Sequence, residues 1–288
     1  MNQSSLYIGV DLGGTQLRMA AVTGAGQLAT EMLSVPTGKQ FTPDELRREL
    51  RGLAARVDEL TSRTPIAGWG VGAAGIVWQG ALTQSDNLPQ LSDIELLALL
   101  SEAAAGLPVA LENDARCFAL AEARFGAGRG ARHVCGITLG TGCGGGVIVE
   151  GQPVRGARGG AGEVWSIPLR DHFLEYFVSG YGLLRTYQEG GGTISDGLTA
   201  ADIAARARQG DAAALAAWQA YGDDVYVLCE TMIALLEPEV IVLGGSMAQA
   251  HDLFGDKFRH KLANRSTRIA LAELGTAAGV IGAAALLF

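Results

Sequence analysis

The first group of residues suited to chemistry is the run Asp11-Leu-Gly-Gly-Thr15, which lies between two predicted strands. Gly13 and Gly14 would let backbone N–H groups approach a phosphate without a Cβ in the way, and Thr15 adds a hydroxyl. Asp11 could hold Mg²⁺ through water, because that ion keeps several waters and takes one or two carboxylates. Taken alone, the run also fits an ordinary tight turn with a leading Asp.

A second glycine-rich run, Gly140-Thr-Gly-Cys-Gly-Gly-Gly146, follows about half a chain later. Its five glycines in seven residues exceed what a hairpin requires, so we expect close approach of the backbone to a ligand at Gly140, Thr141 and Gly142. Two such turns facing each other would suit a polyphosphate tail. Neither run is a P-loop or a dinucleotide-binding fingerprint, because the required spacings are absent.

The segment Glu112-Asn-Asp114 follows a predicted strand and precedes a predicted helix. The helix dipole favours an anionic side chain there, so Asp114 is expected to stay ionised at neutral pH. An ionised Asp suits a group that accepts a proton from a hydroxyl. Asn and Asp are also the favoured helix-capping residues, and in isolation capping is the simpler interpretation.

Two further segments end in residues that could contact a ligand. Gly159-Gly-Ala-Gly-Glu163 places a carboxylate beside small residues, so Glu163 could enter a cleft and bind sugar hydroxyls, although a solvated Glu would fit equally. Val240-Ile-Val-Leu-Gly-Gly-Ser246 predicts a buried strand that ends in Gly244 and Gly245. Ligands of α/β folds lie beyond the carboxyl ends of strands, so this end suits a nucleotide base or ribose as well as it suits a plain turn.

The elements around these segments predict an α/β protein with mixed sheets, because the opening hairpins must be antiparallel and helices alternate with strands further on. Strand, glycine turn, strand, turn, strand occurs twice, about half a chain apart, which suggests two related lobes. The predicted strands cover residues 6–10, 17–22, 28–35, 66–71, 109–111, 133–139, 147–149 and 240–243. The predicted helices cover residues 43–63, 92–105, 115–125, 200–208, 211–236 and 277–287.

Composition narrows the class of protein. The 288 residues suffice for two lobes with a cleft, and 48% hydrophobic against 18% charged residues can bury a large core. The net charge of −8 argues against binding nucleic acid through a basic surface. The sequence has no signal peptide, no apolar run of transmembrane length and no paired spacing among its four cysteines, so a cytoplasmic protein without a membrane partner is expected.

In combination these segments resemble the ROK family (repressors, open reading frames and kinases) of bacterial sugar kinases, and the resemblance extends from Tyr7 to the C-terminus. It implies a two-lobed, actin/hexokinase-like fold of the ribonuclease H-like type. ATP and Mg²⁺ would bind in the cleft between the lobes, and a sugar hydroxyl would accept the phosphoryl group. The expected small lobe comprises residues 1–112 plus 276–288, and the expected large lobe comprises residues 113–275. The resemblance also implies a homodimer.

The resemblance assigns roles to individual residues of this chain. Glu112-Asn-Asp-Ala115 matches the segment that carries the catalytic Asp, so Asp114 would be the general base. The implied sugar ligands are Gly75, Asn87, Asn113, Asp114, Glu163, Ser166 and Glu175. The implied ATP and phosphate contacts are Asp11, with Mg²⁺ held through water, and Gly13, Gly14, Thr15, Gly140, Thr141, Gly142, Gly244 and Gly245.

One segment departs from the family pattern. Family kinases usually carry Gly-Glu-x-Gly-His followed by a cysteine loop that binds zinc, whereas this chain has Trp165 and Ser166 at the Gly and His positions and lacks the cysteine loop. We therefore expect no structural zinc, because His172 alone is a poor substitute for the missing ligands. Trp165 is expected to fill the space and to hold Glu163 and Glu175 in place, while Ser166 keeps a weaker hydrogen bond to the sugar.

Three alternatives to a sugar kinase follow from the same features. A repressor of the family would need a helix-turn-helix ahead of the first strand, and only five residues precede Leu6. A non-catalytic or weakly active sugar-binding regulatory protein of the same fold fits the altered segment, but it would not require Asp11, Asp114 and both glycine turns. A carboxylate acceptor would be repelled by Asp114 and Glu163, so a hexose or N-acetylhexosamine is favoured.

Overall fold

The computed structural model describes residues 5–262 and 265–288, and it contains two five-stranded mixed sheets built in the same way. In each sheet the first three strands form an antiparallel meander, and two later strands extend it in parallel. The first sheet has the order β3 (Leu33–Pro36), β2 (Gln16–Thr23), β1 (Leu6–Leu12), β4 (Ile66–Ala73), β7 (Val109–Asn113). The second has the order β10 (Gln152–Pro153), β9 (Cys143–Val149), β8 (Val134–Leu139), β13 (Val240–Gly244), β14 (Arg268–Leu271). This repetition confirms the prediction of an α/β protein with mixed sheets.

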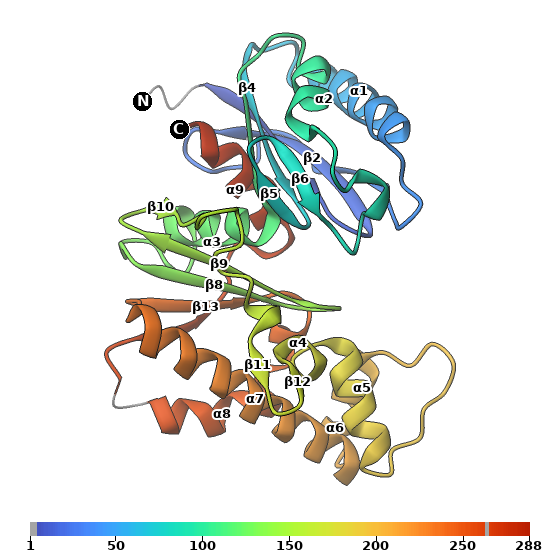
Figure 1. Cartoon of the computed structure of the whole chain (residues 1–288), viewed down its shortest axis with the longest axis vertical. Helices are drawn as coiled ribbons and strands as arrows, with labels where there is room; N and C mark the ends of the chain where they lie inside the picture. Colours follow the sequence, from blue (N-terminus) through green and yellow to red (C-terminus); the bar gives the residue numbers. More distant parts are fainter. Residues whose placement is uncertain (1–4, 263–264) are drawn as a thin grey trace.

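Two helices, α3 (Asp114–Phe125) and α9 (Ala278–Ala284), lie between the two sheets (Figure 1). A buried cluster joins them to both sheets, with Val22 contributed by β2 and Val242 by β13. The backbone of α9 packs directly on β4, since a Cβ added at Gly70 would lie 1.8 Å from a carbonyl oxygen of α9. α9 packs equally closely on α3, since a Cβ at Gly282 would lie 1.8 Å from Cys117 O, and this holds α3, with Asp114 at its first position, between the sheets.

The remaining helices cover the outer faces of the two sheets. One buried apolar cluster lies between the first sheet and its helices, and a second lies between the second sheet and its helices. α1 begins where predicted, because Thr42 and Glu45 form a reciprocal capping box. It ends at Leu60, before the predicted Arg63, because Ser62 and Arg63 adopt positive φ. None of the helices in the described part of the chain is long and apolar enough to cross a membrane. The first sheet carries α1 (Pro43–Leu60) and α2 (Leu96–Ala103), and the second carries α4 (Leu174–Phe177), α5 (Gly180–Glu189), α6 (Ala200–Arg208), α7 (Ala212–Leu236) and α8 (His251–Leu262).

Three predicted elements have different bounds in the structure. The strand expected over 28–35 is reduced to β3, with a single bridge between Leu28 and Val22. The helix expected from Ser92 begins at Leu96. The Ser92 hydroxyl accepts from the N–H of Ser85 and donates to Ser85 O, so Ser92 belongs to the preceding loop. β9 begins well before residue 147, so the last three glycines of the second run are strand residues.

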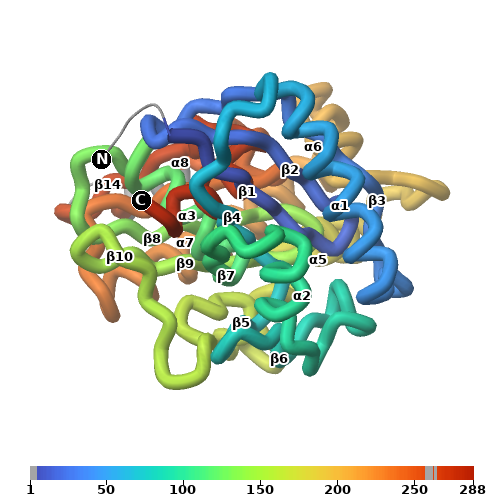
Figure 2. The backbone as a smooth tube through the Cα atoms, turned by 90° about the horizontal axis from the view of Figure 1, so that it is seen from above, coloured from blue at the N-terminus to red at the C-terminus, as the bar shows by residue number. Residues whose placement is uncertain are grey.

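Two short hairpins near the cleft were not predicted. β5 (Ile76–Trp78) pairs with β6 (Ala81–Gln84), and β11 (Pro168–Leu169) pairs with β12 (His172–Phe173). Figure 2 shows the yellow-green segment that follows β10 passing beside β5. In chain order the first hairpin follows β4 of the first sheet, and the second follows β10 of the second sheet.

Candidate active site

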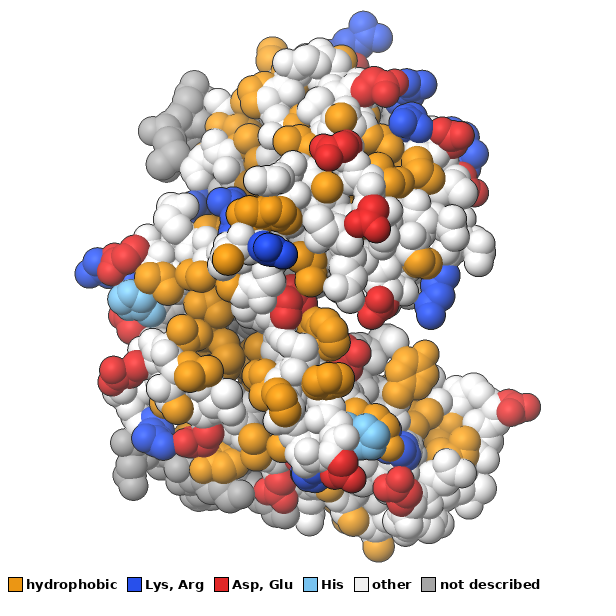
Figure 3. Space-filling view, viewed as in Figure 1, with side chains coloured by type: hydrophobic (Ala, Val, Ile, Leu, Met, Phe, Trp, Pro, Cys, Tyr) orange, Lys and Arg blue, Asp and Glu red, His pale blue; other side chains and the backbone are white. Residues whose placement is uncertain are grey.

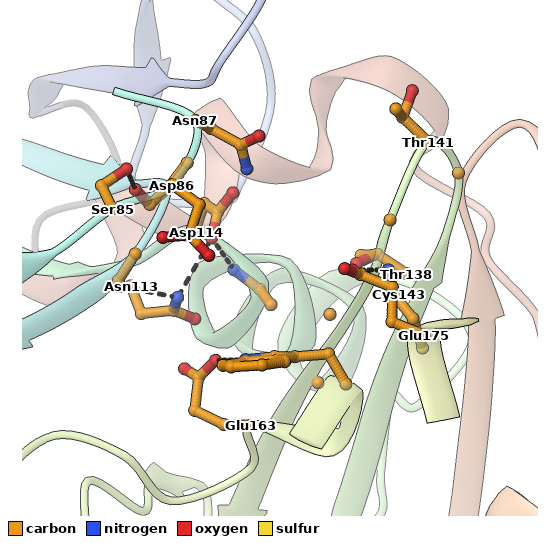
Figure 4. Close-up of a pocket in the computed structure, with 18 of the residues that line it drawn as sticks. Ser85, Asp86, Asn87, Asn113, Asp114, Thr138, Thr141, Cys143, Glu163 and Glu175 are labelled. Atoms are coloured by element: carbon orange, nitrogen blue, oxygen red, sulfur yellow. Dashed lines mark hydrogen bonds between the residues drawn. The ribbon is translucent and has the colours of Figure 1, made fainter. Parts of the chain in front are cut away.

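Two adjoining cavities open between the sheets, with volumes of about 440 Å³ for the first and 570 Å³ for the second. Their walls share Asp114, Ala115, Thr138 and Gly245, so the two form one continuous cleft. Figure 3 shows a hollow between the upper and lower halves of the molecule, with acidic side chains near it. The first cavity, drawn in Figure 4, has most of the predicted sugar ligands in its wall.

The start of α3 is organised by Asn113, which is the helix N-cap. Its Oδ1 accepts from the N–H of Arg116 at 2.9 Å, and its Nδ2 donates to Gly75 O at 3.0 Å and to Asp114 Oδ1 at 3.1 Å. The N–H of Ala115 also donates to Asp114 Oδ1, at 2.9 Å. Asn113 therefore performs the capping that either residue could have provided, and Asp114 is held at the cavity wall.

The protonation of Asp114 differs from the sequence prediction. Burial, followed by the negative charge of Asp11, raises the pKa of Asp114 from 3.8 to about 7. Glu163 also raises this pKa, whereas the hydrogen bond from Ala115 N–H lowers it. The sequence predicted an Asp114 that stays ionised at neutral pH, whereas a pKa of about 7 leaves it only about half ionised there, because desolvation outweighs the favourable end of the helix. A carboxyl with a pKa near neutrality is well matched to accept a proton from a hydroxyl.

Gly75 and Asn87 lie on the same side of the first cavity as Asp114. Gly75 has φ of +133°, and a Cβ there would lie 2.2 Å from a carbonyl oxygen of β6. In Figure 4 Asn87 lies above Asp114, next to Asp86, in the loop after β6. The hydroxyl of Ser85 anchors this loop by donating to Ala74 O at 2.6 Å. The structure thus brings these predicted sugar ligands together.

Glu163 enters the first cavity from the segment that follows β10 of the second sheet, and its carboxylate is fixed by a tryptophan. Trp165 Nε1 donates to Glu163 Oε2 at 2.6 Å, and both side chains line the cavity. Burial raises the pKa of Glu163, while the Trp165 hydrogen bond and the charge of Arg116 lower it. The sequence predicted that Trp165 would hold Glu163 by packing, and the structure adds a direct hydrogen bond.

Ser166 does not reach the cavity wall, in contrast to its predicted role as a sugar ligand. Its hydroxyl donates to the backbone oxygen of Glu163 at 2.8 Å, within the short 3₁₀ turn Val164–Ser166. A short side chain at this position is therefore used to close the local turn. The hydrogen bond from Ser166 to the sugar, which the sequence predicted, therefore has no counterpart in this arrangement.

The tip between β8 and β9 consists of Gly140, Thr141 and Gly142, and all three line the first cavity. Gly140 N–H donates to Gly142 O at 2.9 Å, which closes the turn. A Cβ at Gly140 would have no protein atom nearer than Ser246 Oγ, at 3.8 Å. The turn therefore leaves open space on the side of the cavity, as a phosphate-binding turn would.

Glu175 lies beside this turn, and not beside Glu163. Its Oε2 accepts from the N–H of Cys143 at 2.9 Å, and Figure 4 places it next to Thr138 and Cys143. The sequence assigned Glu175 to the sugar together with Glu163. In the structure the two carboxylates lie at different places in the cavity wall. Trp165 donates a hydrogen bond to Glu163, whereas Glu175 accepts its hydrogen bond from Cys143.

The first glycine turn is placed differently from the second. Gly13, Gly14 and Thr15 are not among the described residues that line either cavity. A Cβ at Gly14 would lie 2.7 Å from the Cβ of Asn87, so the turn packs against the loop that carries a predicted sugar ligand. Gly13 N–H donates to Gln16 O at 3.0 Å and closes the hairpin. The predicted phosphate contacts of this turn are thus not in the cavity wall.

Asp11 lines the second cavity together with an arginine that the sequence analysis missed. Arg18 Nη1 donates to Asp11 Oδ2 at 3.2 Å, across the β1–β2 hairpin where the two residues are paired in register. Burial still raises the pKa of Asp11, against the lowering effect of Arg18. Among the described residues that line the two cavities, Arg18 has the only Lys or Arg side chain. The hairpin register, read from the turn outward, was the signal that could have identified it.

The carboxyl end of β13 forms the far wall of the second cavity. Gly244, Gly245 and Ser246 line it, and Gly245 adopts φ of +87°. A Cβ at Gly245 would lie 2.2 Å from Leu139 O, so only glycine fits where this strand end meets β8. The predicted nucleotide turn therefore borders the cavity, next to the residues shared with the first one.

At the position of the family's cysteine loop, which this sequence lacks, the chain forms the β11–β12 hairpin. The ring of His172 stacks on Tyr176 with centroids 3.8 Å apart, and Phe173 meets Trp165 edge-on at 6.4 Å. All four cysteines are buried. In the described part of the chain, no three His, Cys, Asp or Glu side chains are grouped to hold a metal ion. The residues present here do not fit a structural zinc site.

Comparison with known proteins adds an independent observation. The family model described as the ROK family matches residues 7–288. A glucokinase of Halalkalibacterium halodurans is 32% identical over 96% of this chain and 93% of its own length. An N-acetylgalactosamine kinase of Shewanella sp. is 30% identical over 98% of this chain and 96% of its own length.

Solved structures give the same result. A ROK family glucokinase from Streptomyces griseus in complex with glucose and AMPPNP has a TM-score of 0.81 at 28% identity, covering 98% of this chain and 99% of its own. A ROK hexokinase from Thermus thermophilus has a TM-score of 0.82 at 27% identity, covering 97% and 96%. The predicted actin/hexokinase-like fold is confirmed by these neighbours. The match over nearly the whole chain leads to one conclusion: this protein belongs to the ROK family.

Proposed function

We propose that this protein transfers the γ-phosphoryl group of ATP to a hydroxyl of a hexose or N-acetylhexosamine, with Asp114 as general base. The observation that carries the proposal is the position of Asp114 in the wall shared by the two cavities, with a pKa of about 7. A group there can contact an acceptor in one cavity and the transferring phosphate from the other. The similar glucokinase and N-acetylgalactosamine kinase support the reaction class.

The first cavity has the polar groups that a sugar requires. Asn113 and Glu163 would bind hydroxyls from two sides, and Gly75 and Asn87 complete the wall near Asp114. Carboxylates accept hydrogen bonds from hydroxyls and repel anions, so these acids favour a neutral polyol as acceptor. Glu175, which is bound to Cys143 N–H, is better placed beside the phosphate-binding turn than beside the sugar.

The second cavity and the adjoining turn would hold the nucleotide. Thr141 and Gly142 would direct backbone N–H groups at the phosphates, while the Gly140 N–H closes the turn, and Gly244 and Gly245 would border the adenosine. Arg18 would bring a positive charge to a wall that is otherwise acidic. Such donors stabilise the charge that develops as the phosphoryl group moves.

Asp11 is the residue that would hold Mg²⁺, through water. Its carboxylate is buried at the second cavity and its pKa is raised, so a cation would relieve an unfavourable buried charge. A single carboxylate fits Mg²⁺, which completes its shell with waters and phosphate oxygens. When bound, the ion would neutralise charge on the phosphate oxygens.

In the proposed mechanism the chain's own residues position the acceptor and move one proton. Asn113 and Glu163 orient the sugar so that its reacting hydroxyl faces the carboxylate of Asp114. Asp114 accepts the hydroxyl proton as the oxygen–phosphorus bond forms. Positioning and electrostatic stabilisation carry most of the rate enhancement in such transfers. Closure of the cleft would exclude water, which competes with the sugar as acceptor.

The two halves that would close are proposed to be residues 1–112 plus 276–288 and residues 113–275. The first sheet ends with β7 at Asn113, and α3 begins at the next residue. α9 returns the end of the chain to β1 and β4 of the first sheet. Both boundaries thus fall beside elements that lie between the sheets.

A coupled assay of ADP release with a panel of hexoses and N-acetylhexosamines tests the proposed function. We expect turnover that depends on one or a few sugars and on Mg²⁺. Binding of a sugar without turnover would favour the non-catalytic regulatory protein instead. Turnover of ATP that no sugar stimulates would contradict both interpretations.

Replacing Trp165 with Phe is expected to raise the sugar KM by about 10-fold, because hydrogen bonds to charged groups contribute about 1.5–3 kcal/mol. The change keeps an aromatic ring beside Phe173 but removes the N–H that holds Glu163. Trp165→Gly should raise the sugar KM further, since it also removes the packing. Steady-state kinetics with the sugar varied would detect both effects. An unchanged KM in Trp165→Phe would mean that the hydrogen bond does not organise the sugar site.

We also propose that the protein needs no structural zinc, since Trp165 and the β11–β12 hairpin occupy the position of the family's cysteine loop, which this sequence lacks. Protein stripped with a zinc chelator should keep its full activity once Mg²⁺ is restored. Metal analysis of the purified protein, before and after chelation, checks the assignment. Stoichiometric zinc, or activity that returns only on addition of zinc, would refute it.

A further inference from the structure

α3 carries a buried arginine that joins the Asp114 end of the helix to the loop of Glu163. Arg116 has 0% exposure, and its Nε donates to Glu112 Oε1 at 2.8 Å. Its two terminal nitrogens donate to Ala161 O at 2.8 Å and to Gly159 O at 2.9 Å. All three guanidinium nitrogens are thus hydrogen-bonded within the protein, two of them to the loop that ends at Glu163.

The same loop is also tied at its beginning. Arg155 Nε donates to Glu112 Oε2 at 2.6 Å, and Glu112 is 1% exposed. The N–H of Ala161 donates to Arg155 O at 3.1 Å, which closes the loop on itself. Glu112 therefore connects an arginine of α3 with an arginine of the loop through its two oxygens. We call residues 155–162 the Glu163 loop.

The far side of the Glu163 loop rests on β5. Gly159 has φ of +78°, and a Cβ there would lie 2.1 Å from Val77 O. The loop is therefore wedged between β5 and the guanidinium of Arg116. Gly159 cannot shift without breaking its buried hydrogen bond to Arg116, and an unpaired buried charge is strongly unfavourable.

We propose that Arg116 is a positioning residue for the sugar site, which holds the Glu163 loop against α3 so that Glu163 and Asp114 face the same substrate. A buried ion pair adds little net stability compared with an apolar cluster of the same volume. Its value here is directional, because the planar guanidinium fixes two carbonyl oxygens at once. The charge of Arg116 also lowers the pKa of Glu163 against the effect of burial, which favours the ionised acceptor that a sugar hydroxyl requires.

This inference rests on the proposed function, because it assigns Glu163 to the sugar. Arg116→Gln should raise the sugar KM and the sugar Kd by about 10-fold or more, with the ATP KM changed less than about twofold. Arg116→Lys keeps the charge but loses the fork, so it should restore part of the sugar affinity. Calorimetry with sugar alone and steady-state kinetics measure these quantities separately.

Arg124 on the same helix provides a matched control. It also donates to backbone oxygens, at Ala285 and Phe288, but it holds the chain end and lies outside both cavities. Arg124→Gln should lower the thermal stability and leave both KM values unchanged. A structural role for Arg116 would give the same pattern.

Arg155→Gln keeps the inference testable if Arg116→Gln fails to fold. The Arg155 side chain is 57% exposed, and its loss releases only the beginning of the Glu163 loop. We expect a smaller rise in the sugar KM than in Arg116→Gln, again with the ATP KM preserved. If the wild-type protein binds and phosphorylates a sugar but these variants keep its sugar KM, the inference is overturned. If the wild-type protein neither binds nor phosphorylates a sugar, the proposed function itself fails.

Discussion

Replacing Asp114 with Asn is expected to lower kcat by about 10²–10⁴-fold, the usual effect of removing a general base. Asn keeps the shape of the side chain, and its oxygen can still accept the hydrogen bond from Ala115 N–H. Asn113 remains the helix cap, so α3 should form normally. The measurement is kcat at saturating sugar and Mg²⁺-ATP, with sugar affinity determined by calorimetry as the control. Near-normal turnover in this variant would mean that Asp114 has only a structural role.

The pH dependence gives a second reading of the same substitution. Only ionised Asp114 can accept a proton, so the wild-type kcat/KM should fall about tenfold per pH unit below its pKa of about 7. Stability should change in the opposite sense. Burial raises the pKa of Asp114 from 3.8, its value in the unfolded chain. The stabilising contribution of protonated Asp114 is therefore fully present below pH 3.8 and is lost as the pH rises through about 7. Asp114→Asn should therefore melt higher than the wild type above pH 7, and the difference should shrink as the pH falls.

The second large effect is expected at the glycine turn between β8 and β9. Gly140→Val should lower kcat/KM for ATP by about 10²-fold, since small displacements of a reacting group have effects of that size. Apart from its chain neighbours, a Cβ at Gly140 would have only Ser246 Oγ within 4 Å, at an unstrained 3.8 Å, and Gly140 lines the cavity. At Gly142 the same change would lie 2.4 Å from Glu175 Oε2, so it would also displace that carboxylate. Gly140 is therefore the cleaner test.

Gly52→Val in α1 is the matched control, because a Cβ at Gly52 meets nothing within 4 Å and this helix lies on the outer face of the first sheet. It should leave both substrates' affinities unchanged. Calorimetry should give weakened ATP binding and retained sugar binding for Gly140→Val. Equal ATP affinity in the two variants would mean that residues 140–142 form only an ordinary hairpin turn.

The fold could be predicted where local sequence decides the structure. The start of α1 followed from its capping box, and the alternation of strands and glycine turns gave both meanders. The β5–β6 hairpin was missed because long-range contacts hold it. Ser85 bonds to Ala74 O eleven residues back, and Leu82 pairs with Ile94. Such contacts leave no periodic pattern in the sequence.

The site could be predicted only in part. Asn113, Asp114 and Glu163 do meet in one cavity wall, and their motifs identified them. The raised pKa of Asp114 was not predicted, because desolvation depends on what surrounds a carboxyl in space. Arg116 was missed for a similar reason, since the carbonyl oxygens that it binds lie more than forty residues further along the chain.

The most direct test of the account is to identify the product. Wild-type protein and Asp114→Asn are incubated with Mg²⁺-ATP and the sugar that best stimulates ADP release, and phosphorylated sugar is quantified by ³¹P NMR or mass spectrometry. The account predicts one sugar phosphate for each ADP from the wild type, and at most about a hundredth of that rate from Asp114→Asn. ADP formed without sugar phosphate, or equal rates of sugar phosphate from both proteins, would contradict it.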